Sequence, residues 1–337
     1  MLEHGGKLRA AAQQYNIPLP QWLDLSTGIN PNPWPIPAIP ESAWSRLPED
    51  DDGLLETAKH YYGAPNLLAV AGSQMAIQAL PRLRKTSQVA MLHPSYNEHH
   101  HAWQNNGHQV MSIEADQINT HIDQLEVLLL VNPNNPTAQR FDEQQLLTWH
   151  QRLQQRGGWL IVDEAFLDCT PQHSIARHSH LPGLIVLRSV GKFFALAGAR
   201  IGFVCATEEI LQPLAELIGP WVLSGPARHV AKAVLSDHPQ QQQVRQQLKL
   251  QGERLTQLLS QHHLTPTGST PLFSWIKTTH AEKLHQQLAA EGILTRLFND
   301  PPSIRFGLPK SEPQWQRLAE ALSKLTIKTA RQPRQPS

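Results

Sequence analysis

Residues 127–163, "VLLLVNPNNPTAQRFDEQQLLTWHQRLQQRGGWLIVD", contain two apolar runs with a helical pattern between them. "VLLLV" and "WLIVD" have the composition of buried parallel strands. Asp142 and Gln145 have the spacing of a capping box at a helix start, and Gly157 and Gly158 supply the stop before the second run. A strand, a helix and a strand at this spacing predict a βαβ unit, and hence an α/β sheet.

Further apolar runs extend the sheet on both sides of this unit. "VAML" (89–92), "LIVLR" (184–188) and "IGFVCA" (201–206) are each expected to form a buried parallel strand. After about residue 220, Gln-rich helical segments lead into two short strand-like runs, "LFSWI" and "SIRFGL". This change predicts a second, smaller α+β domain.

The expected division has four parts. Residues 1–40 form an N-terminal arm and a proline-rich connector that pack with the small domain. Residues 41–220 form the large domain, residues 221–326 the small C-terminal domain, and residues 327–337 a disordered tail.

Composition narrows the class of protein. The chain has 337 residues, a formal net charge of +1 and two cysteines. A charge so near zero gives no basis for binding nucleic acid or an anionic membrane, and two cysteines fit a reducing compartment. No apolar run reaches membrane-spanning length, and the N-terminus lacks the apolar segment of a signal peptide. We therefore expect a cytoplasmic protein that acts on a small molecule.

Polar residues follow the expected strands, where open α/β sheets gather their functional groups. Asn135 follows the first run quoted above and Asp163 ends the second, while Ser189 and Lys192 follow the run at 184–188. Arg200 directly precedes the last run. Singly, these residues have structural explanations, because "NPNNP" forms turns and a strand-terminal Asp can cap a helix. Their combination at neighbouring strand ends predicts a site.

The chemistry of this set points to a cofactor. Lys192 lies in the apolar segment "SVGKFFALAG", and a desolvated lysine loses its proton readily and becomes a nucleophile toward carbonyls. Pyridoxal phosphate needs such a lysine for its aldehyde, a carboxylate for its ring nitrogen, an amide for its ring oxygen, and an arginine for its phosphate. The S-x-x-K spacing of Ser189 and Lys192 also occurs in penicillin-binding enzymes, but their S-D-N and K-T-G motifs are absent.

Several motifs carry a resemblance to a known family. "NPNNPT", "VDEAF" and "SVGKFFALAGARIGF" resemble, in order and over nearly the whole chain, the fold-type-I pyridoxal phosphate enzymes of the aspartate aminotransferase superfamily. "HGG", "LDLSTGINPNPWP", "RLPEDDDGLLETAKHYYG", "VAGSQMAIQALPRL" and "SIRFGLP" are similar, more narrowly, to the threonine-phosphate decarboxylases of cobalamin biosynthesis. The resemblance implies a mostly parallel central sheet in a large domain plus a smaller α+β domain.

The resemblance also implies a role for each matching residue. Lys192 would be the Schiff-base lysine and Asp163 the partner of the pyridinium nitrogen, and these two are the expected catalytic residues. The further cofactor ligands would be Asn135 at the ring oxygen, Tyr96 stacked on the ring, and a phosphate group made of Ser73, Gln74, Ser189 and Arg200. Arg305 would hold the substrate carboxylate through a two-point fork. His4, Gly5 and Gly6 would line the substrate phosphate pocket, with Asn30 at a substrate-side strand end.

Two positions depart from the wider superfamily. Phe166 stands where many relatives have a tyrosine after "DEA", so no phenol can bond the ring oxygen there. Leu47 stands where aminotransferase relatives often have the tyrosine of "RYP", which usually reaches the cofactor phosphate of a partner subunit.

The activity implied is pyridoxal-phosphate-dependent decarboxylation of O-phospho-L-threonine to (R)-1-aminopropan-2-yl phosphate for cobalamin biosynthesis, by a homodimer. An aminotransferase for a phosphorylated amino compound such as histidinol phosphate needs the same cofactor residues and stays open, as does a non-catalytic regulator of the same fold. Three adjacent histidines, 99–101, cannot all face one metal ion from a helix, so no metal site is expected.

Overall fold

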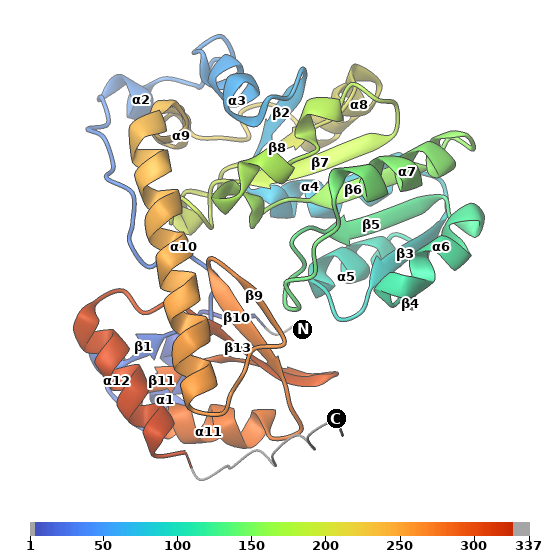
Figure 1. Cartoon of the computed structure of the whole chain (residues 1–337). Helices are drawn as coiled ribbons and strands as arrows, with labels where there is room; N and C mark the ends of the chain where they lie inside the picture. Colours follow the sequence, from blue (N-terminus) through green and yellow to red (C-terminus); the bar gives the residue numbers. More distant parts are fainter. Residues whose placement is uncertain (1–3, 326–337) are drawn as a thin grey trace. The chain divides into compact units, whose positions relative to one another are not determined.

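The structure, a computed structural model, describes residues 4–325 and divides them into two compact units (Figure 1). Unit 1 comprises residues 4–31 and 248–325, and unit 2 comprises residues 32–247. The expected limits at residues 40 and 220 differ from these, and the expected tail at 327–337 lies outside the described residues.

The second limit differs because α9 (Gly225–Ser236) packs on α3 (Leu54–Tyr62) within unit 2. The buried Arg228 of α9 donates from Nε and Nη2 to Asp52, at 2.8 Å each, and from Nη1 to Asp50 at 3.0 Å. These charge-assisted bonds hold α9 to the loop before α3. The chain leaves unit 2 only within α10 (His238–Gln261).

Unit 2 is built on a seven-stranded sheet. Its strand order is β2 (Leu67–Val70), β8 (Gly202–Cys205), β7 (Leu184–Ser189), β6 (Trp159–Asp163), β5 (Val127–Val131), β3 (Gln88–Leu92) and β4 (Gln109–Ile113). The strands from β7 to β4 are parallel, which confirms the α/β class. The expectation that residues 201–206 form a parallel strand was wrong, because β8 runs antiparallel to both β7 and β2.

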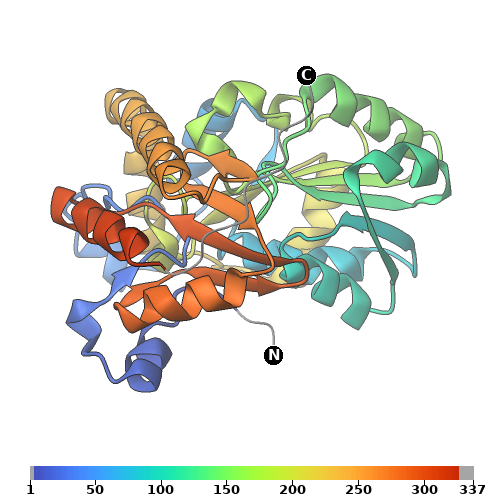
Figure 2. The ribbon, with the colours of Figure 1, turned by 60° about the horizontal axis from the view of Figure 1, so that its bottom comes forward.

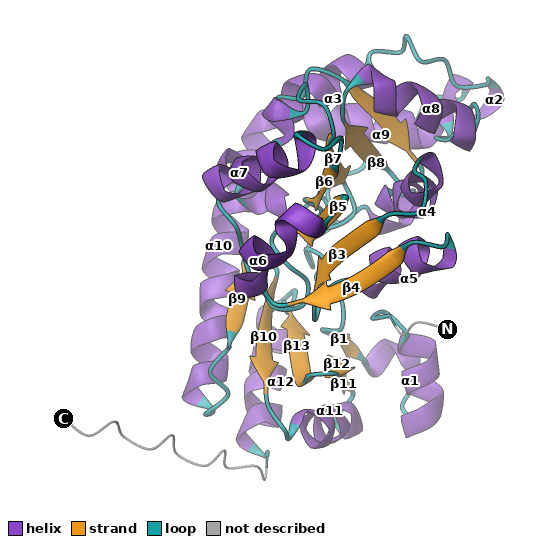
Figure 3. Ribbon diagram, turned by 90° about the vertical axis from the view of Figure 1, so that its right-hand side faces the viewer, coloured by secondary structure: helices purple, strands orange, loops and turns teal. Residues whose placement is uncertain are grey.

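Helices cover both faces of this sheet (Figure 3). On one face α4 (Ser73–Ala79), α5 (Asn97–Asn105) and α8 (Glu208–Ile218) bury a continuous apolar core against the strands. On the other lie α6 (Ile118–His121) and α7 (Glu143–Gln154). Strands buried on both faces explain why the sequence reads as unbroken apolar runs rather than as an alternation.

Two local expectations for unit 2 are confirmed. Asp142 accepts a hydrogen bond from the Gln145 N–H at 2.8 Å, and the Gln145 side chain accepts one from the Asp142 N–H at 3.1 Å, so α7 begins with a capping box. Residues 32–41 form no helix or strand before α2 (Ser42–Ser45).

Unit 1 is an α+β unit with two small sheets. The first is antiparallel, in the order β12 (Arg296–Asn299), β13 (Pro302–Gly307), β10 (Phe273–Lys277), β9 (Gly268–Thr270), and the second pairs β1 (Leu23–Asp24) in parallel with β11 (Ile293–Leu294). The helices α1 (Leu8–Tyr15), α11 (Ala281–Ala290) and α12 (Glu312–Ser323) complete the unit, and α11 packs along β12 and β13 (Figure 2).

Among residues 4–325, no helix combines the length and the apolar character that crossing a membrane requires.

Candidate active site

The residues predicted to hold a cofactor all lie in unit 2. Asp163 and Ser189 are the last residues of β6 and β7, and Asn135 lies in the loop that follows β5. Lys192 lies in the loop after β7, and Arg200 just before β8. The sheet thus brings the ends of three adjacent parallel strands, with their polar residues, to one edge.

Asp163 is buried, and both of its carboxylate oxygens have partners. Oδ1 accepts the Ala165 N–H at 3.0 Å, and Oδ2 lies 2.9 Å from Nε2 of His99, which is itself only 1% exposed. Nothing in the sequence distinguished His99 from its two histidine neighbours. The structure separates it from them, because α5 starts directly after Tyr96 and turns His99 inward.

Tyr96 lies beside this pair. Its ring and the His99 ring are 6.0 Å apart at an angle of 82°. Burial, then the carboxylates of Glu98 and Asp163, raise the pKa of the Tyr96 phenol to about 12, so the ring is neutral at physiological pH. The Tyr96 hydroxyl reaches Oε1 of Gln74 at 3.4 Å, and Gln74 donates to Glu98 at 2.8 Å. These contacts tie Tyr96 to the start of α4.

Two glycines allow close packing around the start of α4. A Cβ on Gly72 would lie 2.6 Å from Nη2 of Arg200, and one on Gly202 would lie 2.6 Å from the Ser73 nitrogen. Gly202 pairs with Ser189 across β7 and β8. The Arg200 guanidinium therefore packs on Gly72, and the Ser73 N–H packs on Gly202, the strand partner of Ser189. Because the first N–H groups of a helix have no partner within it, the start of α4 suits a phosphate.

Lys192 is half-buried, and its ammonium nitrogen lies 5.4 Å from the centre of the Phe166 ring. The two phenylalanines that follow, Phe193 and Phe194, are buried and pack on Trp34. The loop that carries the lysine is thereby anchored by aromatic packing, while the lysine itself remains accessible.

Buried polar contacts that the sequence did not indicate support these loops. Arg188 is 1% exposed and forms ion pairs with Glu164 and, at 2.6 Å, with Asp168. Burial by itself lowers the pKa of Arg188, but the carboxylates of Asp168 and Glu164 outweigh this effect and raise the pKa well above its usual value. Because Glu164 follows Asp163 and Arg188 precedes Ser189, this network joins the ends of β6 and β7. Asn134 similarly bonds Pro94 O at 2.8 Å and the Ser95 hydroxyl at 2.7 Å.

The residues predicted to bind substrate all lie in unit 1. Arg305, on β13, is buried and donates from Nη2 to the main-chain oxygen of Ser26 at 2.9 Å. Burial, followed by repulsion from Arg296, lowers the pKa of Arg305 to about 9. A bound anion would relieve both effects, because it supplies the opposite charge inside the buried site.

Arg296 belongs to the same group, although the sequence did not single it out. It pairs with Arg305 across β12 and β13, which places the two side chains on one face of the sheet. The Phe298 ring lies 5.1 Å from the Arg296 guanidinium and 6.0 Å from that of Arg305. Two guanidiniums directly opposite each other repel, so this face of unit 1 is built for anions.

The predicted phosphate loop borders a cavity of about 320 Å³ in unit 1. His4, Gly5 and Gly6 line it together with Arg296 and Ser26. Asn30 does not line this cavity. We expected Asn30 at a strand end. It is instead buried in the loop beyond β1, because β1 ends at Asp24.

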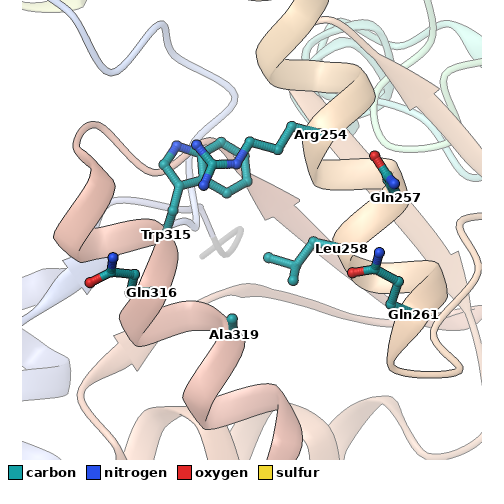
Figure 4. A pocket seen from close by; sticks show the side chains of 7 residues that line it. All are labelled: Arg254, Gln257, Leu258, Gln261, Trp315, Gln316 and Ala319. Atoms are coloured by element: carbon teal, nitrogen blue, oxygen red, sulfur yellow. The ribbon is translucent and has the colours of Figure 1, made fainter.

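A second cavity in unit 1, of about 280 Å³, lies between α10 and α12 (Figure 4). Arg254 lines this cavity, and its guanidinium carbon lies 4.5 Å from the centre of the Trp315 ring. The same guanidinium donates to both carboxylate oxygens of Glu312, at 2.6 and 2.7 Å. Because Glu312 neutralises this arginine, it offers little to an anionic ligand.

No set of three or more His, Cys, Asp or Glu side chains within residues 4–325 is arranged to hold a metal ion.

Comparison with known proteins agrees with this geometry. The family model described as aminotransferase class I and II matches residues 49–322. A threonine-phosphate decarboxylase of Pseudomonas aeruginosa is 56% identical over 96% of this chain and 97% of its own. A histidinol-phosphate aminotransferase of Shewanella oneidensis is 29% identical over 84% of this chain and 78% of its own.

Among solved structures, a histidinol-phosphate aminotransferase of Sinorhizobium meliloti in complex with pyridoxal-5'-phosphate superposes with a TM-score of 0.79. The alignment covers 96% of this chain and 97% of that one, at 18% identity, and so shows the shared fold.

Proposed function

The chain belongs to the aminotransferase class I and II family, and from this premise we propose that it is a pyridoxal-phosphate-dependent decarboxylase of O-phospho-L-threonine. The observation that carries the proposal is the 56% identity, over almost the full length of both chains, to a threonine-phosphate decarboxylase. The histidinol-phosphate aminotransferase is markedly more distant at 29%. The product would be (R)-1-aminopropan-2-yl phosphate, for use in cobalamin biosynthesis.

The residues of unit 2 fit pyridoxal phosphate. Lys192 would bind its aldehyde carbon and Asp163, held by His99, would keep its ring nitrogen protonated. Asn135 would bond the ring oxygen and Tyr96 would stack on the ring. The phosphate would be bound by Ser73, Gln74, Ser189 and Arg200, and the close packing at Gly72 and Gly202 places Arg200 and the Ser73 N–H near the start of α4. When bound, the cofactor supplies an acceptor for the electrons that remain on Cα after carbon dioxide leaves.

The residues of unit 1 fit a substrate with two anionic groups. Arg305 would bind the α-carboxylate, and Arg296 with His4, Gly5 and Gly6 would bind the phosphate. We assign Asn30 to the substrate as well, because it is a buried carboxamide in the loop that follows Ser26. Holding both ends of the substrate would fix its rotation about the Cα–N bond, and that orientation would decide which bond at Cα is broken.

Decarboxylation also needs a proton at Cα. Lys192 is the one amine among the proposed cofactor ligands, and its half-buried position beside Phe166 excludes part of the water around it. We assign it the delivery of this proton. His99 and the Ala165 N–H hold the two oxygens of Asp163 in place.

The proposal extends to the assembly and the compartment. We propose a cytoplasmic homodimer whose interface includes the exposed apolar side chains of unit 2. These are Trp44, at 68% exposed, and Leu47, Ile36 and Trp221, at 60% or more. α2 and the start of α9 pack closely, since a Cβ on Gly225 would lie 2.2 Å from the oxygen of Ala43. Large exposed aromatic side chains on a packed surface are typical of an interface.

The direct test is release of carbon dioxide from O-phospho-L-threonine by the holoenzyme, with and without an added 2-oxo acid. We expect equal release in both, and no release from Lys192→Ala, which should also lack the visible absorbance of the lysine-bound cofactor. Turnover that requires the oxo acid would favour an aminotransferase. A purified protein that takes up no cofactor would favour a regulator without catalysis.

A further inference from the structure

Ser26 is a buried residue of unit 1, 1% exposed, that touches both groups assigned to the substrate. Its main-chain oxygen accepts from Arg305 at 2.9 Å, and its hydroxyl accepts from the Gly6 N–H at 2.7 Å. It therefore lies between the arginine proposed for the carboxylate and the loop proposed for the phosphate.

The direction of each hydrogen bond at Ser26 follows from its partners. Asp24 Oδ1 accepts from both the Ser26 N–H, at 2.8 Å, and the Ser26 hydroxyl, at 2.6 Å. An ionised carboxylate can only accept, so the hydroxyl proton is committed to Asp24. The hydroxyl oxygen then receives the Gly6 N–H through a lone pair, and its orientation is fixed at both ends.

The glycines of the "HGG" loop are explained by the same contact. A Cβ on Gly5 would lie 2.3 Å from the main-chain oxygen of Ser26, so only glycine permits the approach. Gly6 has a φ of +80°, which favours glycine for a separate reason. The loop is therefore seated directly on residue 26, not merely close to it.

We propose that Ser26, oriented by Asp24, is a positioning residue that fixes the separation between the phosphate-binding loop and Arg305. It thereby selects amino acids whose phosphate and carboxylate are spaced as in O-phospho-L-threonine. The inference rests on the proposed function. A ligand held at two anionic groups is bound well only when its own spacing matches that of the two sites, so a rigid link between them acts as a length filter.

The test compares two substrates, O-phospho-L-threonine and O-phospho-L-homoserine, whose chain is one bond longer between Cα and phosphate. Two holoenzyme variants are measured. Ser26→Ala removes the hydroxyl, and Ser26→Cys replaces it with a thiol that keeps the size of the side chain but accepts hydrogen bonds weakly. The control is Ser303→Ala, which removes another buried hydroxyl from the strand that carries Arg305. The Ser303 hydroxyl donates to Pro301 O at 2.9 Å.

For both Ser26 variants we expect KM for O-phospho-L-threonine to rise about tenfold, the loss of one good hydrogen bond, with kcat changed less than about threefold. The kcat/KM preference for O-phospho-L-threonine over O-phospho-L-homoserine should fall by about fivefold or more. Ser303→Ala should leave that preference unchanged. Thermal melting of each variant reports any general loss of stability.

An unchanged preference in the Ser26 variants, whether or not both substrates lose activity, would overturn the inference while leaving the decarboxylase assignment intact. Failure of the unmodified enzyme to turn over O-phospho-L-threonine would instead overturn the proposed function, and the inference with it.

Discussion

At the scale of single residues, three adjacent histidines have three different surroundings. His99 is buried against Asp163, His100 is half-buried, and His101 is exposed. Burial and the neighbouring His93 and His101 lower the pKa of His100. The sequence pattern suggested only that the three could not share a metal. Which of them turns toward β6 depends on where α5 begins, which no local pattern stated.

We predict that His99→Ala weakens cofactor binding and lowers the free energy of unfolding by about 1–3 kcal/mol, because it leaves the buried Asp163 carboxylate with one partner fewer. His101→Ala, two positions along the same helix and exposed, should change neither quantity. Cofactor dissociation constants and denaturant unfolding check both. Equal behaviour of the two variants would contradict the role given to His99.

The lowered pKa of Arg305 leads to a prediction for alkaline solution. Its pKa of about 9 means that the free enzyme loses the guanidinium charge above that pH, and with it the attraction for the substrate carboxylate. We expect kcat/KM to fall as pH rises through about 9. Arg296→Gln removes a repelling charge and should move the midpoint of this fall to higher pH. A profile flat to pH 10, or a midpoint shifted downward, would contradict the prediction.

Some of the candidate site residues were predicted from the residues alone, because they lie at the ends of recognisable apolar runs: Asn135, Asp163, Ser189, Lys192 and Arg200. The others were predicted only through the resemblance to a known family. Arg296 was not predicted, since it lies on a short strand of half-buried residues whose partner strand is set by tertiary pairing. Ser26 and Asn134 were missed for a similar reason: their partners, Gly6 and Pro94, are distant in the sequence.

At the scale of elements, the sequence indicated the central strands and α7 but not every direction or edge. β8 is as apolar as the parallel strands of the sheet, although it runs antiparallel to β7. An apolar run carries no information on strand direction. β4 lies at the sheet edge with a half-exposed pattern, so it lacks the unbroken apolar signal that marked the inner strands.

The start of α4 offers a matched pair of glycine variants. Gly72 and Gly107 have similar positive φ values, +72° and +82°, but a Cβ meets Arg200 at the first and open space at the second. We predict that Gly107→Ala destabilises the protein by about 1 kcal/mol through backbone strain. Gly72→Ala should cost more, because its φ of 72° and ψ of 157° are open essentially to glycine alone and its Cβ meets Arg200, and only Gly72→Ala should weaken binding of pyridoxal phosphate. Titration of the two apoproteins with the cofactor checks this. Equal cofactor affinity in both variants would remove Arg200 from the phosphate site.

At the scale of the whole molecule, composition predicted two units but not their limits. The sequence placed the second limit where the composition changes, near residue 220, whereas packing of α9 on α3 carries unit 2 to residue 247. A boundary inside a long helix such as α10 leaves no mark in composition, because helix propensity continues across it.

We predict that the double variant Trp44→Ser and Leu47→Asp sediments as a monomer at concentrations where the unmodified protein sediments as a dimer, because it removes two large apolar side chains from the proposed interface. Leu250→Ser, which replaces an equally exposed leucine of unit 1, should remain dimeric. A dimer that survives the double change would place the interface elsewhere.

The mass spectrum of the product formed in D₂O shows whether this chain breaks the bond between Cα and the carboxylate. The holoenzyme is incubated with O-phospho-L-threonine and no oxo acid. We predict aminopropanol phosphate with one deuterium bound to the carbon that carried the carboxylate, because the original Cα hydrogen is kept and one proton is added from solvent. Recovered substrate that has exchanged its Cα hydrogen for deuterium and kept its carboxylate would contradict the account, because it would show that the Cα–H bond is the one that breaks.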